Sequence, residues 1–193
     1  MAISDFTGMR LLQISVPGAT ASDPRSYVTL TPANIAADGI DFQIEDNTIT
    51  ISSFAGDQNA FNGLTVDIAT VALLPNSVAI LGQIFPNAYD PATGAFGPAI
   101  GGCSTIGDAD VAFINNCSGK ANVLFKHVAI SISNDNAISR DDPFTWTLSF
   151  APTLSPKSEY GVSGAQATDE TPFIMFNGTY DPTTSTIAYA PVA

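Results

Sequence analysis

The stretch Phe144-Thr145-Trp146-Thr147-Leu148-Ser149-Phe150 decides the fold class of this chain. Large apolar side chains alternate with hydroxyl side chains along it, which is the pattern of a β-strand that has one face on a core. We expect Phe144, Trp146, Leu148 and Phe150 to pack in that core. The three hydroxyl residues between them should lie on the opposite face of the same strand.

Residues 123–133 predict a second and longer strand, and the polar residues 134–143 predict a solvated loop that joins the two strands into a hairpin. An unbroken alternation through 123–133 gives each face of the strand four apolar or aromatic residues, so both faces should be partly covered. One face then carries Leu124, Val128, Ile130 and Ile132, and the other carries Val123, Phe125, His127 and Ala129.

Shorter strands are predicted at residues 10–16, 27–30, 40–44, 48–53, 172–176 and 186–190. Glu45-Asp46-Asn47 should close a hairpin within 40–53, and Asn177-Gly178 is a strong signal for a tight hairpin turn. One short helix is expected within 64–85, where Leu64, Ile68, Val71 and Ala72 have helical spacing.

These patterns predict an all-β fold: an antiparallel β-sandwich or barrel with long loops and at most one or two short helices. We expect residues 1–193 to form a single domain with an N-terminal arm and a long insertion, rich in Gly and Pro, at about 86–116.

The composition excludes several functions. The chain has 193 residues, 6 Lys and Arg against 18 Asp and Glu, and a net charge of −12. Six scattered cations cannot form a basic patch that grips nucleic-acid phosphates or an anionic membrane surface. No apolar run is long enough for a transmembrane helix, and the N-terminus lacks a secretory signal pattern, so synthesis in the cytoplasm is expected.

Catalytic patterns are weak. The single histidine, His127, lies in mid-strand, and the chain has no G-x-S-x-G motif and no phosphate-binding loop, so a structural histidine is the favoured interpretation. Carboxylate pairs lie in segments expected to be polar turns, where ordinary solvated acids are the rule: Asp108/Asp110, Asp141/Asp142 and Glu45/Asp46. We therefore expect no enzyme activity, no cofactor and no metal site.

Three alternatives accompany that expectation. Calcium could bind the oxygen-rich loop formed by residues 134–142, although the EF-hand spacing is absent. Cys103 and Cys117 are either two reduced thiols or a disulfide that forms after release into an oxidising medium, within one subunit or between two. Trp146 could be a ligand platform of a lectin-like module, but its alternation with apolar neighbours favours core packing.

Residues 121–133, the loop with Asp141-Asp142, and residues 144–150 together resemble a pattern of tailed-phage tail tube proteins, whose β-sandwich is shared by the type VI secretion tube protein. The resemblance covers about 30 of the 193 residues. It implies a sandwich flanked by one short helix, hexameric or trimeric rings stacked into a hollow tube, and no catalysis.

We therefore expect a self-assembling structural subunit of a virion, with a tail tube protein ahead of a capsid decoration protein. A carbohydrate- or receptor-binding β-sandwich module is the alternative from another class. The expected partners are further copies of this chain and other virion proteins, with no membrane, and with nucleic acid only as passing cargo.

Two segments without periodicity, residues 1–7 and 86–116, should contact neighbouring subunits. An acidic lumen would repel a passing genome, so the acids of the polar loops are candidates to face it. These candidates are Asp38, Asp41, Glu45, Asp46, Asp135, Asp141 and Asp142.

Overall fold

The computed structural model describes residues 11–18, 23–31, 33–53, 56–73, 78–97, 105–115, 121–133 and 146–191, with the backbone alone for 36–53, 56–73 and 105. The chain forms an all-β fold, as predicted, in which antiparallel strands dominate and α1 (Val78–Ile84) is the one α-helix of the described residues. None of the described helices has the length and apolar character needed to cross a membrane.

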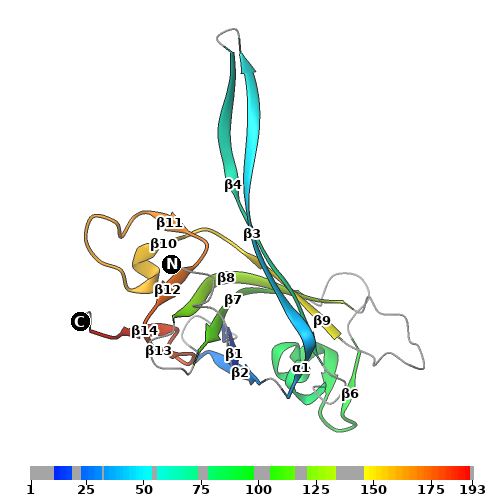
Figure 1. Ribbon diagram of the computed structural model, residues 1–193. Helices are drawn as coiled ribbons and strands as arrows, with labels where there is room; N and C mark the ends of the chain where they lie inside the picture. The colour runs from blue at the N-terminus through cyan, green and yellow to red at the C-terminus, as the bar shows by residue number, and fades with distance from the viewer. Residues whose placement is uncertain are drawn as a thin grey trace.

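The centre of the molecule is an eight-stranded sheet with the order β2-β1-β7-β8-β9-β4-β3, in which β12 also pairs with β8 (Figure 1). All of its pairings are antiparallel. Its strands are β1 (Leu11–Val16), β2 (Ser26–Leu30), β3 (Ile35–Ser53), β4 (Gly56–Leu73), β7 (Thr105–Ile114), β8 (Asn122–Ser133), β9 (Trp146–Pro152) and β12 (Ile174–Phe176).

The alternation that predicted β9 is present in the structure. Leu148 and Phe150 are buried in the core, and Trp146 is half-buried against the same core. Its indole meets the ring of Phe96 edge to face, with the ring centroids 5.3 Å apart. Core packing of Trp146 is therefore confirmed, whereas Phe144 lies outside the described residues.

Apolar clusters cover both faces of the central sheet. The larger cluster joins strands β1, β2, β7, β8 and β9 to Leu81, Ile84 and Phe85 in and after α1. The smaller cluster joins Ala112 and Leu124 of the sheet to three aromatic side chains of the C-terminal segment, which are Tyr160, Phe176 and Tyr180. α1 thus covers one face of the sheet and Tyr160, Phe176 and Tyr180 cover the other, while Phe173 and Met175 of the C-terminal segment pack on the larger cluster.

Short elements complete these two layers. Beside α1 lie η3 (Pro86–Ala88), β5 (Tyr89–Asp90) and β6 (Ala95–Phe96); the C-terminal segment contains β10 (Ser155–Pro156), η4 (Lys157–Tyr160), β11 (Glu170–Thr171), β13 (Gly178–Asp181) and β14 (Thr186–Tyr189). Asp90-Pro91 and Asp181-Pro182 begin the turns that close the hairpins β5–β6 and β13–β14. In each, the aspartate accepts a backbone N–H two residues ahead at 2.9 Å, as is usual for an aspartate that starts a turn.

The strands predicted at residues 40–44 and 48–53 are present, but the turn between them and the helical interpretation of residues 64–72 were wrong. Glu45-Asp46-Asn47 is not a turn but lies within β3. The register shifts between Asp46 and Thr48, where Asn47 opposes two residues of β4. β3 continues to Ser53 and pairs along its length with β4, and β4 contains the residues whose helical spacing suggested a helix. Residues 65–71 include five β-branched side chains, which favour a strand. The short helix expected within 64–85 is present at Val78–Ile84.

Two further predictions needed correction. Residues 105–114 form β7, a central strand of the sheet, although they were expected within a long insertion. Asn177-Gly178 does not close a hairpin, because β12 pairs with β8 while β13 turns away and pairs with β14. The φ of Gly178 is 145°, a value that lets the chain change direction between these two pairings.

Candidate functional site

The candidate site begins at a β-bulge between β7 and β8. Val111 pairs with Phe125 and Ala109 pairs with Val128, so Lys126 and His127 together oppose the single residue Asp110. His127 has a φ of 53°, which lies in the left-handed region that residues other than glycine rarely adopt.

This bulge changes which side chains share a face. Val123 and Phe125 before it, and Val128 and Ile130 after it, all contribute to the larger apolar cluster. The assignment of faces by unbroken alternation was therefore wrong for half of the strand. One extra residue in the strand moves every later side chain to the opposite face from the one that alternation predicts. It also leaves the polar pair Lys126-His127 at the border between the sheet and the C-terminal segment.

His127 contacts a carboxylate through each of its two ring nitrogens. Nδ1 contacts Oδ1 of Asp108 on β7, and Nε2 lies 2.6 Å from Oε2 of Glu159 on η4. The carbonyl of His127 also accepts a hydrogen bond of 2.9 Å from Oγ1 of Thr153. The histidine therefore joins both strands of the bulge to the segment that covers them.

Asp110 lies beside this histidine but is buried, with 3% of its surface exposed. Ser185 Oγ donates to its Oδ2, and Nη2 of Arg25 lies 3.6 Å from its Oδ1. Lys126 Nζ in turn donates to the carbonyl of Ser185 at 3.0 Å. The expectation that Asp110 is a solvated acid in a turn was wrong, because it lies in a strand beneath the β13–β14 hairpin.

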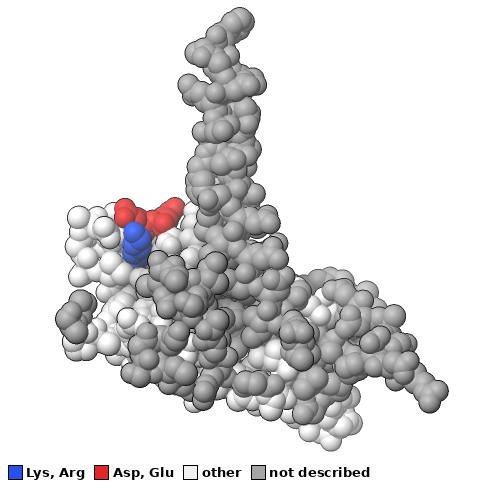
Figure 2. Space-filling model, in the orientation of Figure 1, with Lys and Arg blue, Asp and Glu red and all other residues white. Residues whose placement is uncertain are grey.

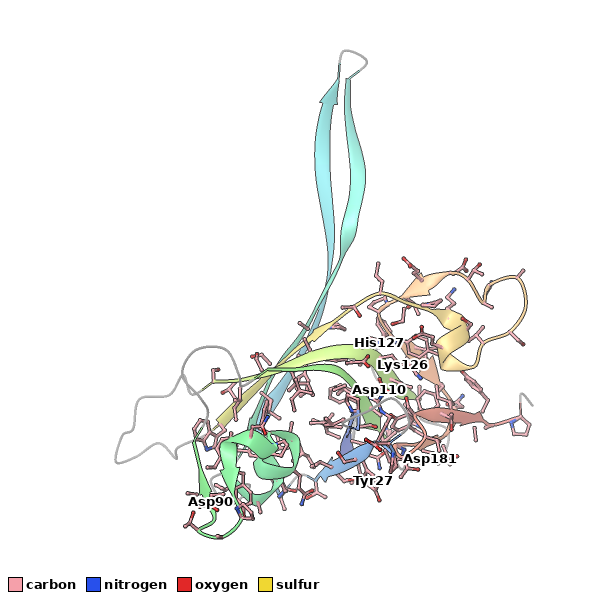
Figure 3. The ribbon with its side chains drawn as sticks, turned by 180° about the vertical axis from the view of Figure 1, so that it is seen from behind. Tyr27, Asp90, Asp110, Lys126, His127 and Asp181 are labelled. Atoms are coloured by element: carbon pink, nitrogen blue, oxygen red, sulfur yellow. The ribbon has the colours of Figure 1, made fainter. Side chains whose placement is uncertain are left out.

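The same group of side chains continues to β1. Ser15 Oγ donates to the carbonyl of Pro182 at 2.6 Å and accepts a hydrogen bond of 2.9 Å from Nε of Arg25. Figure 3 shows Asp110, Lys126 and His127 near one another between the sheet and the C-terminal segment, with Asp90 far away near α1. We refer to Ser15, Arg25, Asp110, Lys126 and Ser185 as the polar cluster.

Burial sets the ionisation of this region. It lowers the pKa of Lys126, against the opposing pull of the carboxylates Asp110 and Glu159. It raises the pKa of Tyr180 to about 12, with a further upward contribution from the charge of Asp110. Burial likewise raises the pKa of Tyr160 to about 12. Both tyrosines are thus neutral at physiological pH and act as packing groups of the smaller apolar cluster.

The side chains of Asp108, His127 and Glu159 can bind protons, and their contacts join the β7–β8 bulge to η4. Nucleophilic catalysis by the Ser-His type needs a ring nitrogen that faces a hydroxyl or a thiol, but both nitrogens of His127 face carboxylates. Among the residues that the structure describes, no group of three or more His, Cys, Asp or Glu side chains could hold a metal ion.

The second candidate feature is the long hairpin of β3 and β4, which projects from the body of the molecule (Figure 1). β9 pairs with β4 at Ile68 and at Val71–Leu73, while β3 pairs with β4 from Ile35 out to Ser53. Residues 43–53 and 56–67 therefore form a two-stranded ribbon, which we call the arm. Its eleven-residue β3 strand extends about 35 Å at the usual rise of a β-strand.

The residues predicted from the sequence fall in different places. Asp38, Asp41, Glu45 and Asp46 lie in β3 and not in loops. Cys103, Cys117, Asp135, Asp141 and Asp142 lie outside the described residues, as do residues 1–7 and the calcium alternative at 134–142. Sequence reasoning missed Arg25, Glu159 and Ser185, which carry no motif and reach the site only through the pairing of distant strands.

Figure 2 shows one small group of acidic and basic side chains on the described part of its face, over the region of β10 and β11. Lys157, which follows β10, and Asp169, which precedes β11, form an exposed ion pair at 3.1 Å. No protein-family model, no curated protein and no solved structure matches this chain.

Proposed function

We propose that this chain is a non-enzymatic structural subunit of a virion that assembles with its own copies into rings or a hollow tube, as a phage tail tube protein does. The arm is the observation that carries the proposal. A single two-stranded ribbon is at best marginally stable in water, because it has no third strand and no covering layer. An arm of this length is expected to rest on another surface.

The sequence of the arm supports a protein partner. It contains large apolar residues on both strands, which are Ile44, Ile49, Ile51, Phe61, Leu64 and Val66. Burying such residues at a subunit interface is favourable by about 25 cal/mol per Å² of apolar area. Among the described strands, β2 and β3 lie at the two edges of the sheet, and an edge strand offers further backbone groups for pairing with a neighbour.

The charge of the hairpin fits a conduit for DNA. Residues 35–73 contain no Lys or Arg and include the acids Asp38, Asp41, Glu45, Asp46, Asp57 and Asp67. Repeated around a ring, acidic hairpins would create a negative potential that repels phosphates. Four of these six acids are among those that the sequence singled out for a lumen, and they now belong to one continuous element.

The proposal is tested by shortening the arm. Residues 45–65 are replaced by Asn-Gly, so that Ile44 and Val66, which are paired in the sheet register, are joined by a two-residue turn. The control variant replaces Phe54-Ala55 by Asn-Gly and keeps the full arm. Negative-stain electron microscopy and light scattering then measure polymers, and circular dichroism measures the thermal midpoint.

We expect stacked rings or tubes from the wild-type chain and the control, and folded monomers with a similar thermal midpoint from the shortened variant. Regular polymers from the shortened variant would contradict a role of the arm in assembly. A wild-type chain that stays monomeric or trimeric at high concentration would contradict the tube and favour a capsid decoration protein or a binding module.

A further inference from the structure

The contacts of His127 define its protonation state. A neutral imidazole has one N–H group and one lone pair, so it can donate to one carboxylate only. In this structure Nδ1 contacts Asp108 and Nε2 lies 2.6 Å from Glu159. With a neutral ring, one of these contacts would place a lone pair against carboxylate oxygen. Both contacts are favourable only when the ring is a doubly protonated imidazolium.

The surrounding charges agree with an imidazolium. β7 presents Asp108 and the buried Asp110, and η4 presents Glu159. The cations are Lys126, which precedes His127 on β8, and Arg25, whose Nη2 donates to the carbonyl of Asp108 at 3.0 Å. Lys126 and Arg25 engage Ser185, Ser15 and Asp110, so His127 is the cation that directly bridges Asp108 and Glu159.

Glu159 lies next to the anchor of the covering segment. The adjacent Tyr160 is 1% exposed, belongs to the smaller apolar cluster, and accepts a hydrogen bond of 3.3 Å from the backbone N–H of Lys126. Gly161, at a φ of 81°, ends η4 by donating to the carbonyl of Ser158. A change at the Glu159 contact therefore acts directly on the turn that holds Tyr160 against the sheet.

We propose that Asp108, His127 and Glu159 form a proton-operated latch, which fastens η4 to the β7–β8 bulge when the imidazole is charged and releases it when the imidazole is neutral. The latch does not depend on the proposed assembly function. It makes the attachment of the C-terminal segment a property that a change of pH can alter without unfolding the sheet.

The direction of the response follows from the histidine. Partial burial lowers the pKa of His127, hydrogen bonds from the ring to Asp108 and Glu159 raise it, and the net shift is upward from 6.5. The latch is therefore closed below pH 6.5 and opens as the pH rises through the pKa of the folded protein, which lies above 6.5.

The chain has one histidine, so the proton resonances of its imidazole are assigned without further labelling. Titration of the wild-type protein by NMR should give a pKa above 6.5. The variant Glu159→Gln should lower that pKa by about one unit, because it removes one of the two carboxylates. The control Asp169→Asn, which removes an exposed acid that pairs with Lys157, should leave it unchanged. A wild-type pKa at or below 6.5, or equal values in all three proteins, would overturn the latch.

Opening is measured by hydrogen exchange of the peptides that span 157–169, divided by the intrinsic exchange rates at each pH. At pH 6 we expect His127→Gln and Glu159→Gln to exchange at least about five times faster than the wild type in these peptides and at equal rates in β9. At pH 9 the wild type should approach the variants. Equal protection of 157–169 in all proteins at pH 6 would overturn the proposal even if the pKa is raised.

Discussion

Gly178 controls how the chain passes from the sheet into the C-terminal hairpin. Its φ is 145°, and an added Cβ would lie 2.1 Å from the carbonyl oxygen of Ala188 on the paired strand. Gly178→Ala should therefore lower the free energy of unfolding by at least about 1–3 kcal/mol. The control Gly97→Ala, where a Cβ meets no atom within 4 Å, should change it by less than about 0.5 kcal/mol. Equal urea midpoints for the two variants would contradict the strain at Gly178.

Trp146 provides a second prediction about a single residue. It is half-buried on the larger cluster and meets Phe96 edge to face, so Trp146→Ala should destabilise the protein by about 2–4 kcal/mol. A double-mutant cycle with Phe96→Ala should give a coupling energy of about 0.5–1.5 kcal/mol. A loss below 1 kcal/mol for Trp146→Ala, measured by denaturant unfolding, would make the ring a surface group and support the ligand-platform alternative.

At this scale the sequence predicted packing better than it predicted polar contacts. Leu148 and Phe150 were assigned correctly because burial follows from local alternation. Asp110 was assigned to solvent because its burial depends on Ser185 and Arg25, which lie 75 and 85 positions away in the chain. The only sign of this burial in the local sequence is that Asp110 stands between two apolar residues, Ala109 and Val111.

The β7–β8 bulge is the element that the sequence could not reveal. Lys126 and His127 oppose one residue, so the strand keeps Val123, Phe125 and Val128 on one face despite a broken alternation. The sequence of one strand does not distinguish a bulge from a change of face, because a bulge is defined by how many residues the partner strand places opposite it. For the same reason Glu45-Asp46-Asn47 suggested a turn, whereas pairing with β4 carries β3 straight through it.

This interpretation of the bulge predicts opposite effects for two deletions. Deleting His127 removes the extra residue, so the apolar residues on both sides keep their face and the loss of stability should stay below about 2 kcal/mol. Deleting Ala129 instead moves Ile130, which is fully buried, and Ile132 to the wrong face. That should cost about 3–6 kcal/mol, at about 1.5–3 kcal/mol for each of the two large apolar side chains.

Chemical denaturation of both variants is the measurement, and near-ultraviolet circular dichroism reports whether Trp146 keeps its packing. A His127 deletion that unfolds the protein as fully as the Ala129 deletion would show that the bulge residue itself is required for the sheet.

The latch predicts a pH dependence of stability. The pKa of His127 is higher in the folded protein than its ordinary value of 6.5, so its contribution is fully present below that pH. It is lost as the pH rises through the folded pKa. Since the contacting side chains are about half exposed, solvent screening limits the change to at most about 1 kcal/mol. Thermal midpoints of wild type and His127→Gln should differ at pH 6 and converge at pH 9; a constant difference would exclude an electrostatic origin.

For the whole molecule, the hairpin and the body have opposite characters. The body covers both faces of its sheet with apolar clusters and holds its charges in pairs, such as Lys157 with Asp169 and Arg25 with Asp110. The hairpin carries acids without a basic residue between Ile35 and Leu73. If copies assemble around an axis with these hairpins together, like charges must approach one another at every interface.

This charge asymmetry makes assembly sensitive to salt. Salt screens charge repulsion over about 8 Å at physiological ionic strength, so polymerisation should strengthen from 20 mM to 300 mM salt, as followed by light scattering. Replacing Glu45 and Asp46 by Lys should turn the repulsion of DNA into retention at low salt, because each phosphate contact adds salt-sensitive affinity. The control with Asp169 and Glu170 replaced by Lys has a similar change of net charge on the body. Polymers of the hairpin variant that retain no more DNA than those of the control would place the hairpin acids away from any channel.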